Sequence, residues 1–256
     1  YTIINHNSDY GFSSNLKNAD FNINCSIFSD SMYLYYFQST VIGSFEKQLR
    51  RINLSFLYDS NRKNILCNFD SIKNLKNEFN SPFFSFSHFL SPHPPFLFKE
   101  DGSKVNFTNL SLVDEISYLD KKLYIGQLKF INFKTKDLIK NILANDKESI
   151  IIIQSDHGSK YLSKLLGSKD NDPKIDRRTI YTSLEELEIL NAIYLPKGKN
   201  QYIYDGLTPV NTFRLIFKHF MKLDIETIED KNYYNINSHY DRDYNFEDVT
   251  NFLKNN

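Results

Sequence analysis

The chain of 256 residues has no tryptophan, two methionines, eight glycines and two cysteines. Cys25 and Cys67 stand far apart, and no C-x-x-C pair exists, which excludes a thiolate zinc site and a thioredoxin-like redox motif. Their spacing neither requires nor forbids a disulfide. Because a domain of this size does not need a covalent link for stability, we expect both cysteines to be free, buried thiols.

A net charge and long apolar runs are also missing. The chain carries 31 Lys and Arg residues against 31 Asp and Glu residues, so its formal net charge is zero. A nucleic-acid-binding face needs an excess of basic side chains, and we therefore expect no nucleic-acid partner. No apolar run approaches the roughly 20 residues that a membrane-spanning helix requires. The chain begins Tyr-Thr-Ile-Ile-Asn, without an initiator methionine or a signal-peptide pattern, and we expect it to start within a longer protein.

The most informative segment is residues 150–158, which read Ile-Ile-Ile-Ile-Gln-Ser-Asp-His-Gly. Four consecutive isoleucines do not alternate with polar residues, so they predict an interior strand of a parallel sheet, buried on both faces. Asp156 and His157 follow this strand, and Gly158 allows a sharp turn. Ligands bind beyond the carboxyl ends of parallel strands, where a carboxylate beside an imidazole suits a divalent metal. The alternative is an aspartate that caps the next helix and a histidine that packs beside it.

Other segments predict an α/β fold. Strands are expected at residues 1–5, 82–90 and 190–195, and helices at residues 70–79, 112–145, 209–221 and 246–253. The helix at 112–145 leads into the isoleucine strand and forms an α-then-β unit with it. The sequence shows no internal repeat and no domain boundary. We therefore expect one domain over residues 1–256, with a mostly parallel central sheet and helices on both faces.

A proline-rich loop follows the strand expected at residues 82–90. Its sequence, Ser-Pro-His-Pro-Pro-Phe at 91–96, contains three prolines, which lack amide donors and exclude a helix or a central strand. His93 lies between two of these prolines, and a rigid loop lowers the entropy cost of holding an imidazole toward a ligand. We therefore expect His93 to be functional. His88 lies in an apolar strand and is expected to pack or to support a ligand, whereas His6 has no context that suggests a role.

Several segments, in this order along the chain, resemble the alkaline phosphatase and sulfatase superfamily. Asp156-His157-Gly158 after its strand is similar to the second metal-ligand motif of that superfamily. Within it, the chain most resembles sulfatase-domain proteins of the lipoteichoic acid synthase and phosphoglycerol or phosphoethanolamine transferase kind. The other matching segments are Ala19-Asp20, residues 86–96 with their His-Pro-Pro-Phe, residues 124–132, residues 190–196 and residues 208–214.

This resemblance implies a reaction class and roles for individual residues. It implies an alkaline phosphatase-like domain that acts as a metal-dependent hydrolase or transferase on phosphate or sulfate esters of a cell-envelope or lipid-linked substrate. Asp156 and His157 would coordinate the catalytic divalent metal, which is Mn, Zn, Ca or Mg. His93 would contact the phosphate or sulfate group that is transferred. The longer protein would act at the extracytoplasmic face of a membrane. It would contact that membrane only through a segment upstream of this chain.

One part of the family pattern is not matched. The superfamily has a further acidic metal ligand, and a Thr, Ser or formylglycine nucleophile, on an early strand and at the start of the following helix. We therefore expect residues 1–256 to be a sulfatase-like domain truncated at its amino terminus and catalytically silent by itself. Two alternatives stay open. The chain is either a non-catalytic binding or structural domain with this fold, or an unrelated α/β protein in which Asp156 caps a helix.

Overall fold

The computed structural model describes residues 1–8, 10–25, 55–80, 82–105, 120–159, 161, 185–196, 199–235 and 246–254. The chain forms two compact units, Tyr1–Asp146 and Lys147–Asn256. The prediction of a single domain over residues 1–256 stays a prediction. Within the described ranges, no helix is long and apolar enough to cross a membrane.

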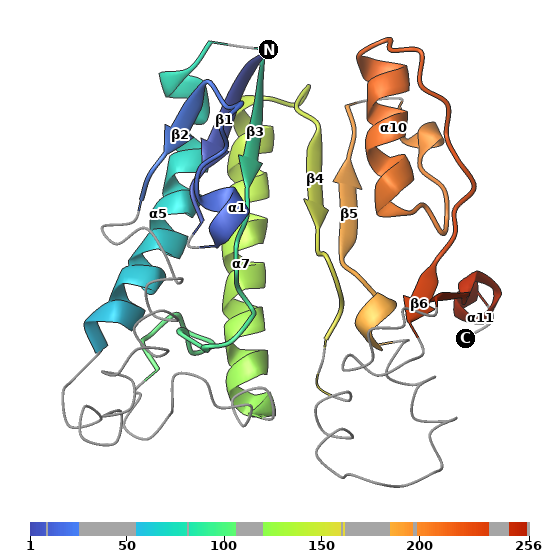
Figure 1. The fold of residues 1–256 in the computed structure, drawn as a ribbon. Coiled ribbons are helices and arrows are strands. Elements are labelled where there is room, and N and C mark those ends of the chain that lie inside the picture. Colours follow the sequence, from blue (N-terminus) through green and yellow to red (C-terminus); the bar gives the residue numbers. More distant parts are fainter. Residues whose placement is uncertain are drawn as a thin grey trace, which may run out of the picture. The chain divides into compact units, whose positions relative to one another are not determined.

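The first unit is built on a parallel sheet of three strands. β1 (Thr2–His6) is the central strand and lies between β2 (Phe21–Ile23) and β3 (Phe83–Ser87). Both neighbours run parallel to β1, so the three carboxyl ends meet at one edge of the sheet (Figure 1). The strand predicted at residues 1–5 is thus confirmed, and the one predicted at residues 82–90 is present but ends at Ser87, so His88 lies beyond the strand and not within it.

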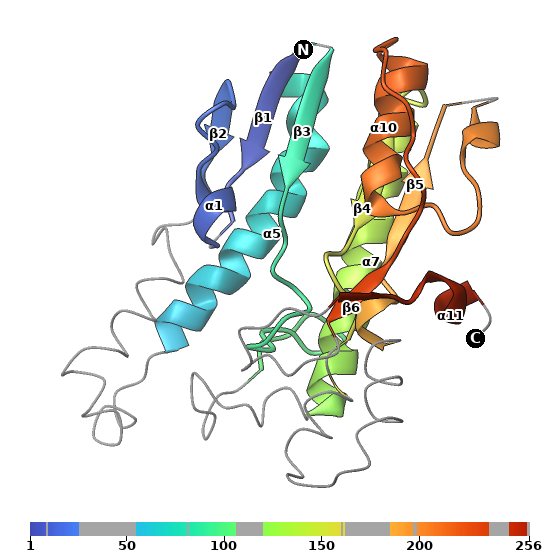
Figure 2. The same cartoon turned by 45° about the vertical axis from the view of Figure 1, so that its right-hand side comes forward.

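Two long helices pack together in the first unit. α5 (Ser55–Glu78) lies behind the sheet in Figures 1 and 2, next to α7 (Lys121–Asn145), and the short helix α1 (Gly11–Ser14) follows β1. The apolar core that joins α5, α7 and the chain after β3 consists of Ile65, Phe69, Leu97, Phe98, Ile131 and Leu138. This core explains why both helices form, because each buries one apolar face.

The predicted helix boundaries in this unit need two corrections. The helix expected at residues 70–79 is the last part of the longer α5, which begins at Ser55. The helix expected from residue 112 is described from residue 121, and residues 106–119 lie outside the described part. Asp120 caps α7, since its carboxylate accepts a hydrogen bond of 3.0 Å from the backbone N–H of Leu123.

The isoleucine segment forms a strand in the second unit, as predicted, but its described pairing is different from the expected one. β4 (Ile151–Gln154) pairs with β5 (Asn191–Tyr194) in antiparallel orientation (Figure 1). The four residues of β4 are half-buried, whereas the prediction had them buried on both faces. The expectation of a parallel neighbour is therefore wrong for this partner. A run of isoleucines indicates apolar surroundings but carries no information on the direction of the adjacent strand.

The remaining elements of the second unit follow β5. A short 3₁₀ turn, η1 (Asn200–Tyr202), precedes α10 (Pro209–Phe220), which starts with proline in its first turn as predicted. The end of the described chain contains β6 (Tyr233–Asn235), the antiparallel β7 (Phe246–Asp248) and α11 (Thr250–Lys254). The helix expected at residues 246–253 is therefore wrong over its first three residues, which form a strand.

Two side chains hold the start of α10. Asn211 donates a hydrogen bond of 2.8 Å to the Ile228 carbonyl and accepts one of 3.0 Å from the Ile228 N–H. Asp230 accepts hydrogen bonds from the backbone N–H and the hydroxyl of Thr208, which precedes the helix, and from the hydroxyl of Tyr204. Burial, together with this bond to Asp230, raises the pKa of Tyr204 to about 12. The chain after α10 is thereby tied back to the beginning of the helix.

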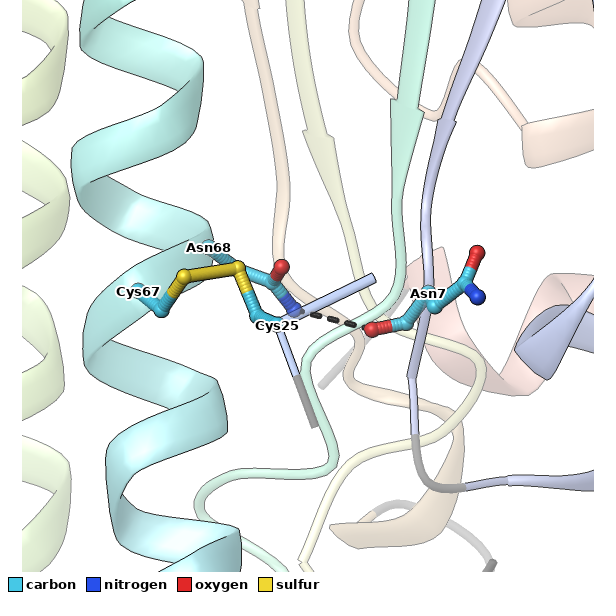
Figure 3. The surroundings of a disulfide bond; sticks show 4 residues. All are labelled: Asn7, Cys25, Cys67 and Asn68. Atoms are coloured by element: carbon cyan, nitrogen blue, oxygen red, sulfur yellow. Dashed lines mark hydrogen bonds between the residues drawn. A yellow bond between two sulfur atoms is a disulfide. The ribbon is translucent and has the colours of Figure 1, made fainter. Parts of the chain in front are cut away.

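Cys25 and Cys67 form a disulfide, which overturns the expectation of free thiols (Figure 3). The bond joins the chain just beyond β2 to the middle of α5. The next residue of α5, Asn68, donates a hydrogen bond of 3.1 Å to the Asn7 carbonyl just beyond β1. The size of a domain bears on its stability as a whole, whereas this bond fixes one helix locally to the carboxyl edge of the sheet.

Reduction of the disulfide should lower the free energy of unfolding by about 4 kcal/mol, because a link across 42 residues restricts the unfolded chain by that amount. Urea unfolding with and without a thiol reductant measures the effect. The double variant Cys25→Ser, Cys67→Ser should match the reduced chain and show no response to reductant. An unfolding midpoint that reductant leaves unchanged in the native chain would contradict this prediction.

Candidate functional site

Asp156 and His157 present two ligand atoms toward each other. The Nε2 atom of His157 and the Oδ2 atom of Asp156 lie 3.7 Å apart. Metal–ligand bonds of about 2.1 Å would let both atoms reach one ion between them, at a ligand–metal–ligand angle of about 120°. The side chain of Asp156 is 87% exposed and that of His157 is 38% exposed, so an ion can approach from solvent. The pair therefore has the geometry of two of the ligands of a divalent cation.

A backbone carbonyl selects which nitrogen of His157 is available to a metal. The Nδ1 atom of the ring lies 2.6 Å from the carbonyl oxygen of Gly158. A carbonyl only accepts hydrogen bonds, so Nδ1 carries the proton, and the lone pair of the neutral ring is on Nε2. This is the arrangement in which histidine ligands are commonly held by a partner of the other ring nitrogen. On Asp156, Oδ1 accepts the His157 N–H at 3.0 Å, and Oδ2 is the oxygen that lies nearer Nε2.

The turn that carries this pair is packed on the segment that precedes β5. The backbone N–H of Gly158 donates a hydrogen bond of 2.7 Å to the Glu186 carbonyl. A Cβ atom on Gly158 would lie 2.0 Å from the carbonyl oxygen of Glu185, which no side chain can tolerate. Glycine is therefore required by the close approach of two backbones. The predicted reason, a sharp turn, is replaced by this one, since the φ angle of Gly158 is not positive.

Ser155 fixes the chain immediately before Asp156 and His157. Its N–H donates to the Leu190 carbonyl at 2.9 Å, and its hydroxyl oxygen accepts the Leu190 N–H at 2.9 Å. These two bonds extend the β4–β5 pairing by one residue. As a result, Asp156 follows directly after a segment of fixed backbone.

His93 is exposed in the first unit, in the loop that follows β3. Its N–H donates to the Leu90 carbonyl at 2.9 Å, and its Nδ1 atom lies 2.5 Å from the carbonyl oxygen of Pro94. As in His157, Nδ1 therefore carries a proton, and Nε2 is the nitrogen at which a proton can be taken up or released. The loop is irregular, as predicted from its prolines.

His88 lies one residue beyond β3 and contacts Ser13. The Nδ1 atom of His88 is 2.7 Å from the Ser13 hydroxyl, and its ring meets the Tyr10 ring edge-on. Ser13 is fully buried, so this serine–histidine pair is closed to a substrate and does not serve as a nucleophile with its base. The contact agrees with the packing or supporting role expected for His88.

The structure places the three predicted site residues in different units. His93 belongs to the unit Tyr1–Asp146, and Asp156 and His157 belong to the unit Lys147–Asn256. The structure brings together the side chains of Asp156 and His157, the two candidate metal ligands. That His93 faces the same site stays a prediction.

His6, to which the sequence gave no role, is fully buried at the carboxyl end of β1. Its Nε2 atom lies 3.1 Å from the Ser85 hydroxyl, and within the described part of the chain its Nδ1 atom has no hydrogen-bond partner. Burial lowers the pKa of His6 to about 4, so the ring is neutral at pH 7. The sequence signal available for His6 was its position directly after the predicted first strand.

Comparison with protein families identifies the chain. The family described as Sulfatase matches residues 25–243, which include His93, Asp156 and His157. The chain therefore belongs to the Sulfatase family, and the predicted superfamily is confirmed. Comparisons with curated proteins and with solved structures find no match. The Sulfatase domain points to a hydrolase or transferase of sulfate or phosphate esters, and members of the family generally use a divalent metal ion.

Acid should destabilise the chain through His6. Its pKa of about 4 in the folded state lies below the ordinary histidine value of 6.5, so the unfolded chain takes up the proton first as the pH falls. The free energy of unfolding should therefore decrease between about pH 6.5 and about pH 4, by at most about 3 kcal/mol. Urea unfolding across this interval measures the decrease.

The variant His6→Gln should lose most of this decrease, because it removes the buried group that titrates. His219→Gln serves as a matched control, since His219 stacks on Tyr202 in the other unit and is not fully buried. It should retain the native pH dependence. An equal acid effect in the native chain and in His6→Gln would show that His6 is not its source.

Proposed function

We propose that the chain is the metal- and anion-binding part of a hydrolase or transferase of phosphate or sulfate esters. In this proposal Oδ2 of Asp156 and Nε2 of His157 hold a divalent ion, and His93 contacts the anionic group of the ester. The observation that carries the proposal is the 3.7 Å approach of these two atoms, with the proton of His157 held on the opposite nitrogen. When bound, the ion would neutralise charge on the ester oxygens and lower the pKa of a nucleophile.

His93 would act through Nε2. Because its Nδ1 proton is held by the Pro94 carbonyl, any further proton is gained and lost at Nε2. A protonated ring then donates from Nε2 to a non-bridging oxygen of the ester or to the oxygen of the leaving group. The ring is exposed, so an anionic group can reach it from solvent.

We further propose that the ester belongs to a cell-envelope or lipid-linked molecule. The resemblance of the sequence to lipoteichoic acid synthases and to phosphoglycerol or phosphoethanolamine transferases supports this substrate class. The Cys25–Cys67 disulfide supports a location outside the cytoplasm, because disulfides persist in oxidising compartments and are rare in the reducing cytosol.

A second candidate function is ester binding without turnover. Among the described residues, no group of three or more His, Cys, Asp or Glu side chains could hold a metal ion. The carboxyl end of β1 carries Asn5, His6 and Asn7, although the family resemblance implies an acidic metal ligand after an early strand. These observations favour a domain that keeps the fold and binds an anionic ligand.

Metal binding should depend on both members of the pair. We expect weak binding of Mn²⁺ or Zn²⁺ to the full chain in a calorimetric titration. Asp156→Asn and His157→Gln should each weaken it at least about tenfold, because each removes one of two ligands. Asp224→Asn removes an equivalent exposed carboxylate of the same unit and should leave binding unchanged. Equal affinities in all four proteins would refute the metal assignment and leave the second candidate function.

Turnover tests whether residues 1–256 contain a complete catalytic site. The test measures hydrolysis of a chromogenic phosphodiester and a chromogenic sulfate ester with added Mn²⁺ or Zn²⁺. For residues 1–256 alone we expect none, because the acidic ligand and the nucleophile of the family pattern are not matched in this sequence. Turnover that both Asp156→Asn and His157→Gln abolish would show instead that a complete catalytic site lies within these residues.

A further inference from the structure

Gln127 is a buried amide on α7, and each of its polar atoms is used on the loop that carries His93. The side chain is 1% exposed. Its Oε1 atom accepts the N–H groups of Leu97 at 2.6 Å and of Phe98 at 3.2 Å, and its Nε2 atom donates to the His93 carbonyl at 3.3 Å. A buried amide is costly unless it is hydrogen-bonded, and these three bonds account for its presence in the core.

The loop needs such a partner because it cannot form a regular backbone ladder. Pro94 and Pro95 lie between the two points that Gln127 holds, and neither has an N–H group to donate. One side chain therefore bonds the backbone on both sides of the two prolines. The distance between the carbonyl of His93 and the amides of Leu97 and Phe98 is set by a single rigid amide plane.

The orientation of the His93 ring depends on the same stretch of backbone. The Nδ1–H of the ring donates to the Pro94 carbonyl, one peptide beyond the carbonyl that Gln127 holds. The His93 carbonyl belongs to the peptide that leads into Pro94, and the proline ring fixes φ there, so a bond to the His93 carbonyl also limits where the Pro94 carbonyl can lie. The bond from Gln127 therefore keeps the Pro94 carbonyl in reach of Nδ1.

We propose that Gln127 is a positioning residue that sets the orientation and the tautomer of the His93 ring. The neutral ring then carries its proton on Nδ1, and a second proton is gained and lost at Nε2. The inference rests on the proposed function only in that the ring so oriented contacts an anionic group. Gln127 itself touches neither the ester nor the metal.

The variant Gln127→Glu tests this on the full chain. It keeps an oxygen that accepts the N–H groups of Leu97 and Phe98, but it replaces the donor to the His93 carbonyl by an oxygen that repels it. Asn132→Asp, on the exposed side of the same helix, makes the same amide-to-carboxylate change and is the matched control. The ¹⁵N shifts of the His93 ring at alkaline pH report which nitrogen carries the proton.

We expect the native chain and Asn132→Asp to have the His93 proton on Nδ1, and Gln127→Glu to lose this preference. The affinity for inorganic sulfate is measured by titration followed at the same ring. It should fall by about tenfold in Gln127→Glu alone, as for a lost hydrogen bond to a charged group. An unchanged His93 tautomer in a folded Gln127→Glu chain would overturn the proposal. If that variant does not fold, a native chain with the proton on Nε2 overturns it.

The two readouts separate this inference from the proposed function. Sulfate that does not perturb the His93 ring of the native chain would count against the proposed anion contact. The tautomer in Gln127→Glu would still decide whether Gln127 positions the ring.

Discussion

The described structure depends on buried amide side chains that hold irregular backbone. Gln127 of α7 bonds both sides of the proline loop, Asn68 of α5 holds the carbonyl of Asn7, and Asn211 of α10 pairs with Ile228. Each side chain is at most 2% exposed and comes from a helix. An amide offers a donor and an acceptor in one plane, so it can replace the neighbouring strand that a loop lacks. Rigid helices thereby fix the chain at points where no sheet can do so.

The same dependence on backbone partners extends to the candidate site. His93 and His157 both direct Nδ1 at the carbonyl of the residue that follows them, Pro94 and Gly158 respectively. This contact determines the tautomer without using a second side chain, and it leaves Nε2 as the nitrogen for metal or proton chemistry. The two histidines were proposed for different roles, yet the structure prepares both rings in the same way. The precision of such a ring depends on how well the local backbone is held.

The sequence was sufficient for features that depend on local pattern. The run at Ile151 forms a strand, Pro209 begins a helix, and the prolines around His93 give an irregular loop, because propensity and proline geometry act over a few residues. The ordered motifs also led to the correct superfamily. The assignment of metal ligands to Asp156 and His157 is consistent with the approach of their side chains in the structure.

Features that depend on distant partners could not be obtained in this way. The disulfide of Cys25 requires α5 to lie beside the end of β2, and the antiparallel direction of β5 depends on the path of the chain between the two strands. In the sequence, Gln127 is an ordinary helix residue. Its role becomes visible only through its hydrogen bonds to the proline loop beside the helix. The burial of His6 likewise follows from the two strands that flank β1. In each case the missing information is which segments become neighbours.

The contact at Gly158 links the turn that carries Asp156 and His157 to a segment almost thirty residues later. The backbones of Gly158 and Glu185 leave no room for a side chain, so the Asp156-His157 turn packs directly against residues 185–188. Small displacements of residues 185–188 would be transmitted to Nε2 of His157 and Oδ2 of Asp156 without a change in either residue. In related chains, changes of residues in this segment would therefore alter the distance between these two atoms while the Asp-His-Gly triplet stays the same.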